Sequence, residues 1–206
     1  MVSLYILFFA TISSNSMIRL SIKAIVQKSL LVSFSAFLIW QSIQLVSNIV
    51  QPIHSTPVGD IFIQAILLNL FITGVFLIGY ALPLHRLLPT SYYRSVQSKA
   101  FVTACAILKI KLFQKLLRLT FWSPRNNKKH FFNGRKSGLS QFERNTRISE
   151  SSHIFAFVFI TVVSCYIAFV ANIYLAIIAL LTNLFFNFYP AMLQRYHRLR
   201  MRNIIA

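Results

Sequence analysis

Acidic residues are scarce in this chain: Asp and Glu together number 3 among 206 residues, against 21 Lys and Arg. Such a small set cannot supply the several carboxylates that the Glu and His motifs of di-metal helix bundles require. The 2 cysteines form no CxxC pair, so neither a disulfide framework nor a zinc motif is indicated. We therefore expect no metal and no cofactor.

Recognisable catalytic motifs are also missing. The sequence contains no GxSxG, P-loop or GxGxxG motif. No histidine is followed five residues later by aspartate, which is the pattern of soluble-headed glycerolipid acyltransferases. These absences argue against a nucleophile-elbow hydrolase and against a nucleotide-binding fold.

Apolar sequence is what the chain has in excess. Hydrophobic residues make up 56% of it, the mean hydropathy is +0.64, and charged residues reach 12%, against roughly 25% in soluble domains. Runs of about 20 apolar residues have the length that spans the hydrocarbon core of a bilayer. Four such runs cover residues 29–50, 61–82, 153–173 and 174–193. The sequence predicts an all-α integral membrane protein with four transmembrane helices.

The cations lie in three segments that these runs separate. Three precede the first run, 14 lie in residues 83–152 and 4 follow the last run, while the two short connecting loops carry none. By the positive-inside rule, both termini are cytoplasmic and the protein is a multi-pass protein of the cell membrane. Because the cations flank the apolar runs as membrane topology requires, the positive charge needs no nucleic-acid partner to explain it, and we expect none.

The chain therefore divides into four segments. Residues 1–28 are a cytoplasmic N-terminal segment, and residues 29–82 are a first helical hairpin. Residues 83–152 are the basic cytoplasmic segment, and residues 153–206 are a second hairpin with a basic tail. A start at Met17 in place of Met1 would also give a basic segment running into the first span, so the sequence leaves the start open.

An amphipathic pattern runs through residues 99–121 of the basic segment. Lys111, Lys115 and Arg118 share one helical face, and leucines run beside them. A helix of this kind lies in the headgroup plane with its cations toward lipid phosphate. We expect an interfacial helix there that contacts anionic phospholipids.

Chemically useful side chains gather at the start of the third apolar run. Glu143, Arg147, Glu150 and His153 step by four, three and three residues, so they lie near one face of a helix. An acid beside a histidine can orient the imidazole and raise its basicity, and the imidazole can then remove a hydroxyl proton. The alternative is that the charges form surface ion pairs and that His153 is an interfacial residue with a satisfied hydrogen bond.

The last run carries a second polar set. Asn183 and Asn187 lie in apolar sequence before a Tyr189-Pro190 break, and the cationic stretch QRYHRLRMR follows. The two amides either join helices by hydrogen bonds, or they hydrogen-bond to a substrate or to Glu150 and His153. Guanidinium groups in the tail are suited to hold an anionic donor.

Taken together, these motifs resemble the glycosyl-4,4'-diaponeurosporenoate acyltransferase family, small membrane acyltransferases of carotenoid biosynthesis. The resemblance covers roughly residues 109–202 and includes KLFQKLL, TRxxExxH and NxYPxxxQRYxRxR. The residues that match the last two patterns are Thr146, Arg147, Glu150, His153, Asn187, Tyr189, Pro190, Gln194, Arg195, Tyr196, Arg198 and Arg200.

The resemblance implies a fatty acyl transfer onto a hydroxyl of a membrane-embedded glycolipid or glycosylated carotenoid acid, from an acyl thioester donor. It implies His153 as the catalytic base and Glu150 as the residue that orients it. The expected substrate-binding or donor-binding residues are Arg147, Asn183, Asn187, Tyr189, Gln194, Arg195, Arg198 and Arg200. The alternative function is a non-enzymatic membrane subunit or scaffold that binds anionic lipid and a partner protein.

Overall fold

The computed structural model describes residues 2–51, 57–80, 82–94, 99–120 and 139–205. Those residues form helices joined by turns, with no strand among them. Four helical stretches in this part of the chain are long and apolar enough to cross a membrane: Ala24–Val50, Val58–Ile78, Leu139–Val170 and Ile173–Met201. The prediction of an all-α protein with four membrane-spanning helices is confirmed.

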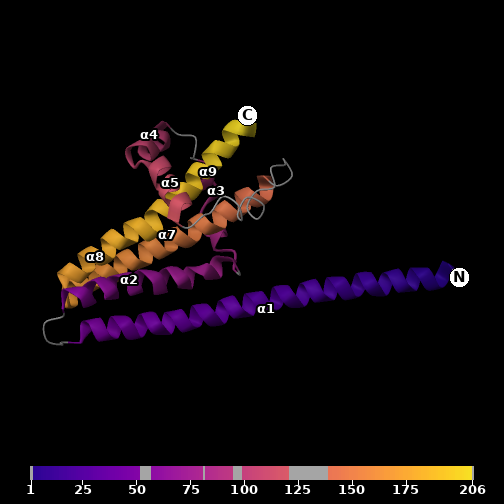
Figure 1. Cartoon of the computed structure of the whole chain (residues 1–206), viewed down its shortest axis with the longest axis horizontal. Coiled ribbons are helices and arrows are strands. Elements are labelled where there is room, and N and C mark those ends of the chain that lie inside the picture. Colours follow the sequence, from indigo (N-terminus) through magenta and orange to yellow (C-terminus); the bar gives the residue numbers. More distant parts are fainter. Residues whose placement is uncertain (1, 52–56, 81, 95–98, 121–138, 206) are drawn as a thin grey trace.

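The helices form two hairpins that lie side by side (Figure 1). The first hairpin joins α1 to α2, and the second joins α7 to the stretch that contains α8 and α9. The elements in chain order are α1 (Val2–Val50), α2 (Val58–Val75), η1 (Phe76–Tyr80), η2 (Leu84–Arg86), α3 (Thr90–Arg94), α4 (Lys99–Ile107), α5 (Ile110–Thr120), α7 (Leu139–Val170), α8 (Ile173–Asn183), η5 (Leu184–Phe188) and α9 (Tyr189–Ile205).

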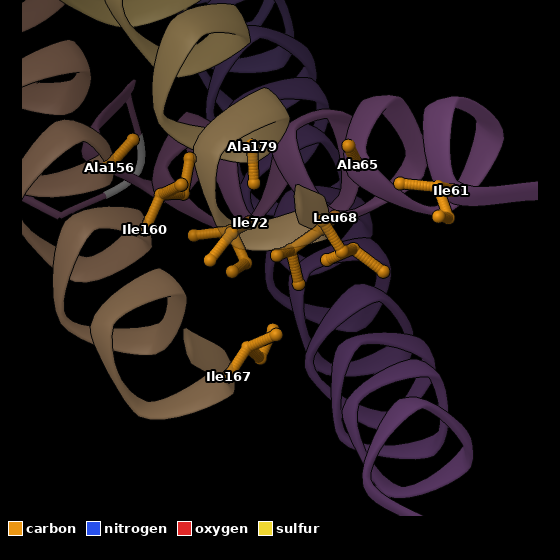
Figure 2. Close-up of a cluster of buried hydrophobic side chains, with 10 residues drawn as sticks. Ile61, Ala65, Leu68, Ile72, Ala156, Ile160, Ile167 and Ala179 are labelled. Carbon is orange, nitrogen blue, oxygen red and sulfur yellow. The ribbon is translucent and has the colours of Figure 1, made fainter. Parts of the chain in front are cut away.

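The main core lies where α2, α7 and α8 meet. Ile61, Ala65, Leu68 and Ile72 recur at helical spacing on α2 and point toward residues of the other two helices, as Figure 2 shows. Small residues such as Ala179 let the helices approach closely, which matters in a bilayer because lipid is as apolar as the side chains. Packing therefore holds these three helices together.

One buried amide joins α2 to α8 inside this core. The Nδ2 of Asn69 donates to the carbonyl oxygen of Ala179 at 3.1 Å and to Oγ1 of Thr182 at 2.8 Å. Asn69 is fully buried, so these contacts replace the water that its NH2 group would otherwise bind, whereas its Oδ1 has no hydrogen-bond partner among the described residues. The pair of helices is thereby fixed in register as well as packed.

The predicted turn between the third and fourth apolar runs is present. Asn172 caps α8, with its side-chain oxygen accepting from the backbone N–H of Tyr174 at 2.9 Å and of Leu175 at 3.1 Å. An asparagine at this position satisfies N–H groups that have no partner within the helix. The chain therefore reverses here with no charged residue.

The single amphipathic helix expected over residues 99–121 is two helices, α4 and α5. The break falls at Lys109, which has a φ of 50°. The backbone N–H of Phe113 donates to the carbonyl oxygen of Lys109 at 3.2 Å, so the hydrogen bonds of α5 begin at this residue. A lysine in the left-handed region costs roughly 1–2 kcal/mol, so periodicity alone gives no reason to expect a turn there. The two helices pack on α9 through a cluster that contains Phe101, Cys105, Ile110, Phe113, Leu193 and Leu199.

The proline of the last run does not end the helix. A π-helical turn, η5, precedes it, and the N–H of Tyr189 bonds to the carbonyl oxygen of Leu184, five residues back. Pro190 has no N–H and its ring crowds the preceding turn, so a widened turn accommodates it. This turn contains Asn187 and sets the direction in which α9 leaves α8.

Candidate active site

The predicted catalytic histidine lies deep along α7. His153 precedes Val170, where α7 meets the uncharged turn, by roughly 17 residues, or about 26 Å at 1.5 Å per residue. A bilayer has a hydrocarbon core about 30 Å thick. A span that ends at Val170 would place His153 near the opposite boundary of the hydrocarbon core.

A chain of amide hydrogen bonds leads to this histidine. The Nδ2 of Asn183 donates to the carbonyl oxygen of Phe157 at 2.9 Å and to Oγ1 of Thr161 at 3.3 Å. The Nδ2 of Asn187 then donates to Oδ1 of Asn183 at 3.0 Å. Both amides are fully buried, so the chain is held inside the bundle.

The chain fixes which ring nitrogen of His153 carries the proton. A backbone carbonyl can only accept, so the contact with Phe157 sets the orientation of Asn183 and, through it, that of Asn187. Oδ1 of Asn187 is thus an acceptor, and it lies 3.2 Å from Nδ1 of His153. Nδ1 must be protonated to donate to it, and the neutral ring presents an unprotonated Nε2.

Thr73 of α2 completes the contacts of this amide. Its hydroxyl donates to Oδ1 of Asn187 at 3.0 Å, so one oxygen receives hydrogen bonds from two helices. Thr73 could not be identified from the sequence, because a threonine in an apolar run is typical of any membrane helix. The amides at 183 and 187 do join helices, and through Asn187 they also hold the histidine.

Glu150 does not have the expected partner. Its Oε2 accepts from Nη2 of Arg198 in a buried ion pair, and its Oε1 accepts from the hydroxyl of Tyr92 at 2.7 Å. Glu150 and Arg198 are both fully buried. The expectation that Glu150 orients His153 is corrected: Asn187 is the residue that contacts the imidazole, because Glu150 points to α9 and α3 while His153 points to η5.

Two tyrosines of α3 pack among the arginines of this cluster. The guanidinium carbon of Arg195 lies 4.4 Å from the centre of the Tyr92 ring, and its Nη2 donates to the Tyr92 carbonyl oxygen at 3.0 Å. The guanidinium carbons of Arg147 and Arg198 lie 4.9 and 5.3 Å from the centre of the Tyr93 ring. Such cation–π contacts contribute roughly 0.5–2 kcal/mol each, more where they are desolvated.

Both tyrosines remain protonated at neutral pH. Burial, followed by the charge of Glu150, raises the pKa of Tyr92 and raises the pKa of Tyr93 to about 12. Tyr92 can therefore act as a hydrogen-bond donor to the carboxylate. Neither tyrosine was identified from the sequence, although a Tyr-Tyr pair inside a cationic segment is a signal that could have drawn attention to them.

The other predicted site residues lie in three different places. Arg147 pairs with Glu143 at 2.6 Å on the partly exposed surface of α7, as expected for charges four residues apart. Tyr189 packs its ring against Phe113, with the centres 5.1 Å apart. Gln194 is half-buried on α9, and Arg200 is exposed beside a cavity between α4, α5 and α9.

The predicted residues therefore separate into a histidine–amide group and an ion-pair group. The first contains His153, Asn183 and Asn187, and the second contains Glu150, Arg195 and Arg198 with Tyr92 and Tyr93. Within the described ranges, no three His, Cys, Asp or Glu side chains come together in a way that could hold a metal ion. The arrangement suits proton transfer at Nε2 of His153, next to an aromatic and cationic cluster.

Comparison with known proteins gives one match. A family model described as glycosyl-4,4'-diaponeurosporenoate acyltransferase matches residues 89–206, which is more than half of the chain. No curated protein and no solved structure matches. The matched segment contains both groups of site residues and excludes α1 and α2.

Proposed function

Because the chain belongs to the glycosyl-4,4'-diaponeurosporenoate acyltransferase family, an acyltransferase family of carotenoid biosynthesis, we propose that His153 catalyses the transfer of a fatty acyl group. The acceptor is a hydroxyl of a membrane-embedded glycolipid or glycosylated carotenoid acid, and the donor is an acyl thioester. The observation that carries this proposal is the contact between Nδ1 of His153 and Oδ1 of Asn187, which leaves Nε2 free to accept a proton.

The reaction needs one base and no added co-reactant. Nε2 of His153 accepts the proton of the acceptor hydroxyl while that oxygen attacks the thioester carbonyl carbon. Collapse of the tetrahedral species breaks the carbon–sulfur bond, and the imidazolium returns the proton to the leaving thiolate. The products are an ester and a thiol, and the histidine is regenerated.

The depth of His153 suits both reactants. An apolar acceptor reaches the site through the bilayer, with its sugar at the headgroup level where His153 lies. A water-soluble thioester with an anionic carrier approaches from the cationic side, where Lys and Arg raise its local concentration. Holding both at one boundary supplies the proximity that a two-substrate transfer requires.

Replacing His153 with glutamine tests this function. We expect acyl transfer to fall by roughly 10²–10⁴-fold, which is the contribution of a positioned general base. Lipids and pigments are profiled by mass spectrometry in cells that carry the wild type, a deletion or His153→Gln at equal membrane level. The expected product, heavier than its acceptor by one fatty acyl group, should be lost in both the deletion and the variant.

His197→Gln is the matched control. The ring of His197 packs against Phe142, with the centres 6.2 Å apart, and takes no part in the proposed chemistry. Cells with His197→Gln should still contain the acylated product. An unchanged profile in the deletion strain, with expression shown in the parent, would instead favour a scaffold that binds anionic lipid and a partner protein.

The proposed orientation places both termini in the cytoplasm. This follows from the cations, all 21 of which fall on one side if four helices span the membrane. A reporter fused after the C-terminus should be active only in the cytoplasmic form, and a reporter inserted in the uncharged loop after α1 should be active only in the external form. The reverse pattern would contradict the proposal that the donor reaches the site from the cytoplasm.

A further inference from the structure

A cavity of about 570 Å³ lies between α4, α5 and α9, outside the group of residues around His153. Its wall is mainly apolar and includes Cys105, Leu112, Tyr196 and Leu199. Cavities of 300–1,000 Å³ with apolar walls and a few polar groups are typical of ligand sites. The size is therefore that of a binding site for a small molecule or a lipid chain.

Three cations border this apolar space. Lys109 lies in the break between α4 and α5, Lys111 is in the first turn of α5 and Arg200 is on α9, and all three side chains are exposed. No acidic residue lines the cavity among the described residues. An apolar space with a cationic margin is complementary to a molecule that has an acyl chain and an anionic headgroup.

The backbone conformation of Lys109 is a second observation that supports a ligand site here. Its φ of 50° lies in the left-handed region, where glycine or asparagine is favoured over lysine. The chain thus keeps a charged side chain at a position where a smaller residue would fit with less strain. A strained backbone position at the edge of a cavity is consistent with a role for that side chain in binding.

We propose that this cavity binds a phosphate-bearing acyl amphiphile, with the acyl chain against the apolar wall and the phosphate on Lys109, Lys111 and Arg200. Two sources share this chemistry, an anionic phospholipid of the membrane and a fatty acyl thioester of a phosphate-bearing carrier. Binding of the thioester would also rest on the proposed acyl transfer, whereas binding of the phospholipid stands without it.

The cavity is separate from the ion pair at Glu150. Arg198 points from α9 toward α7, whereas Tyr196, Leu199 and Arg200 of the same helix line the cavity beside α4 and α5. Burial raises the pKa of the Cys105 thiol in the wall, which lowers its thiolate fraction. The proposal for this cavity is therefore ligand binding alone.

The test uses the purified full chain in detergent and native mass spectrometry. One arm adds phosphatidylglycerol, with phosphatidylcholine of the same acyl chains as a comparison, and the other arm adds palmitoyl-coenzyme A. The wild type should bind one molecule in at least one arm. The double variant Lys109→Asn and Lys111→Gln should bind about 25-fold more weakly, at roughly fivefold for each cation removed.

The control double variant is Lys99→Gln and Arg144→Gln, which removes two exposed cations that do not border the cavity. It should bind within about twofold of the wild type if the cavity is the site. Asparagine tolerates the left-handed conformation, so the double variant Lys109→Asn and Lys111→Gln should fold. Arg200→Gln is an independent second variant at the same cavity. Equal weakening by both double variants, or no binding in either arm, would overturn the proposal.

The two arms also identify the source. Binding of phosphatidylglycerol alone assigns a membrane lipid, and binding of palmitoyl-coenzyme A alone assigns the donor. Because both are binding measurements, they do not depend on acyl transfer. A wild type that binds ligand but transfers no acyl group would refute the proposed function and leave the cavity site intact.

Discussion

Replacing Glu150 with glutamine should lower the free energy of unfolding by roughly 3–5 kcal/mol, because it leaves the buried guanidinium of Arg198 without its counter-ion. Both side chains are fully buried, and Nε and Nη1 of Arg198 have no hydrogen-bond acceptor in the part of the chain that the structure describes. The variant also weakens the acceptor of the Tyr92 hydroxyl. Unfolding in detergent, followed by circular dichroism, measures the loss.

Two further variants separate the buried charge from other causes. Glu143→Gln removes the same charge from the same helix, but its ion pair with Arg147 is 31–35% exposed, so the cost should stay below about 1 kcal/mol. The combined variant Glu150→Leu, Arg198→Met and Tyr92→Phe should regain most of the lost stability, since apolar groups can replace a buried ion pair. A loss of the same size in Glu143→Gln would contradict this account.

The contrast between these two glutamates shows which side-chain contacts could be predicted from the sequence and which could not. The spacing of Glu143, Arg147 and Glu150 correctly indicates one helix, and the pair between Glu143 and Arg147 follows from that spacing alone. Glu150 instead pairs with Arg198, which lies 48 residues away. Periodicity predicts neighbours within a helix, but the partner across an interface depends on how two helices pack.

The same limit applies to His153. The spacing of three residues puts Glu150 and His153 on the same face of α7, but their side chains contact different helical segments. Hydropathy predicted the membrane helices, because length and apolar composition decide which segments can cross a bilayer. The break at Lys109 had no such signal, since a lysine is not a turn residue and its backbone conformation is set by packing.

Replacing Asn187 with leucine should lower the turnover number of acyl transfer by about 100-fold or more. Leucine cannot accept the hydrogen bond from Nδ1, so the imidazole loses both its fixed orientation and the preference for an unprotonated Nε2. The Michaelis constants for donor and acceptor should change little, because Asn187 is fully buried and acts through the histidine. Steady-state kinetics in membranes with equal protein content measure both quantities.

Thr73→Val is the matched comparison, because the Thr73 hydroxyl donates to the same oxygen of Asn187 from another helix, α2. Valine removes that bond and keeps the shape of the side chain, at a cost near 0.6 kcal/mol for an average hydrogen bond between membrane helices. If Asn187 positions the base, Thr73→Val should retain most of its turnover while Asn187→Leu does not. If both variants lose turnover equally, the amide chain only joins α2, α7 and α8, and another group must hold the imidazole. Comparing the two variants therefore tests whether Oδ1 of Asn187 fixes the tautomer of His153.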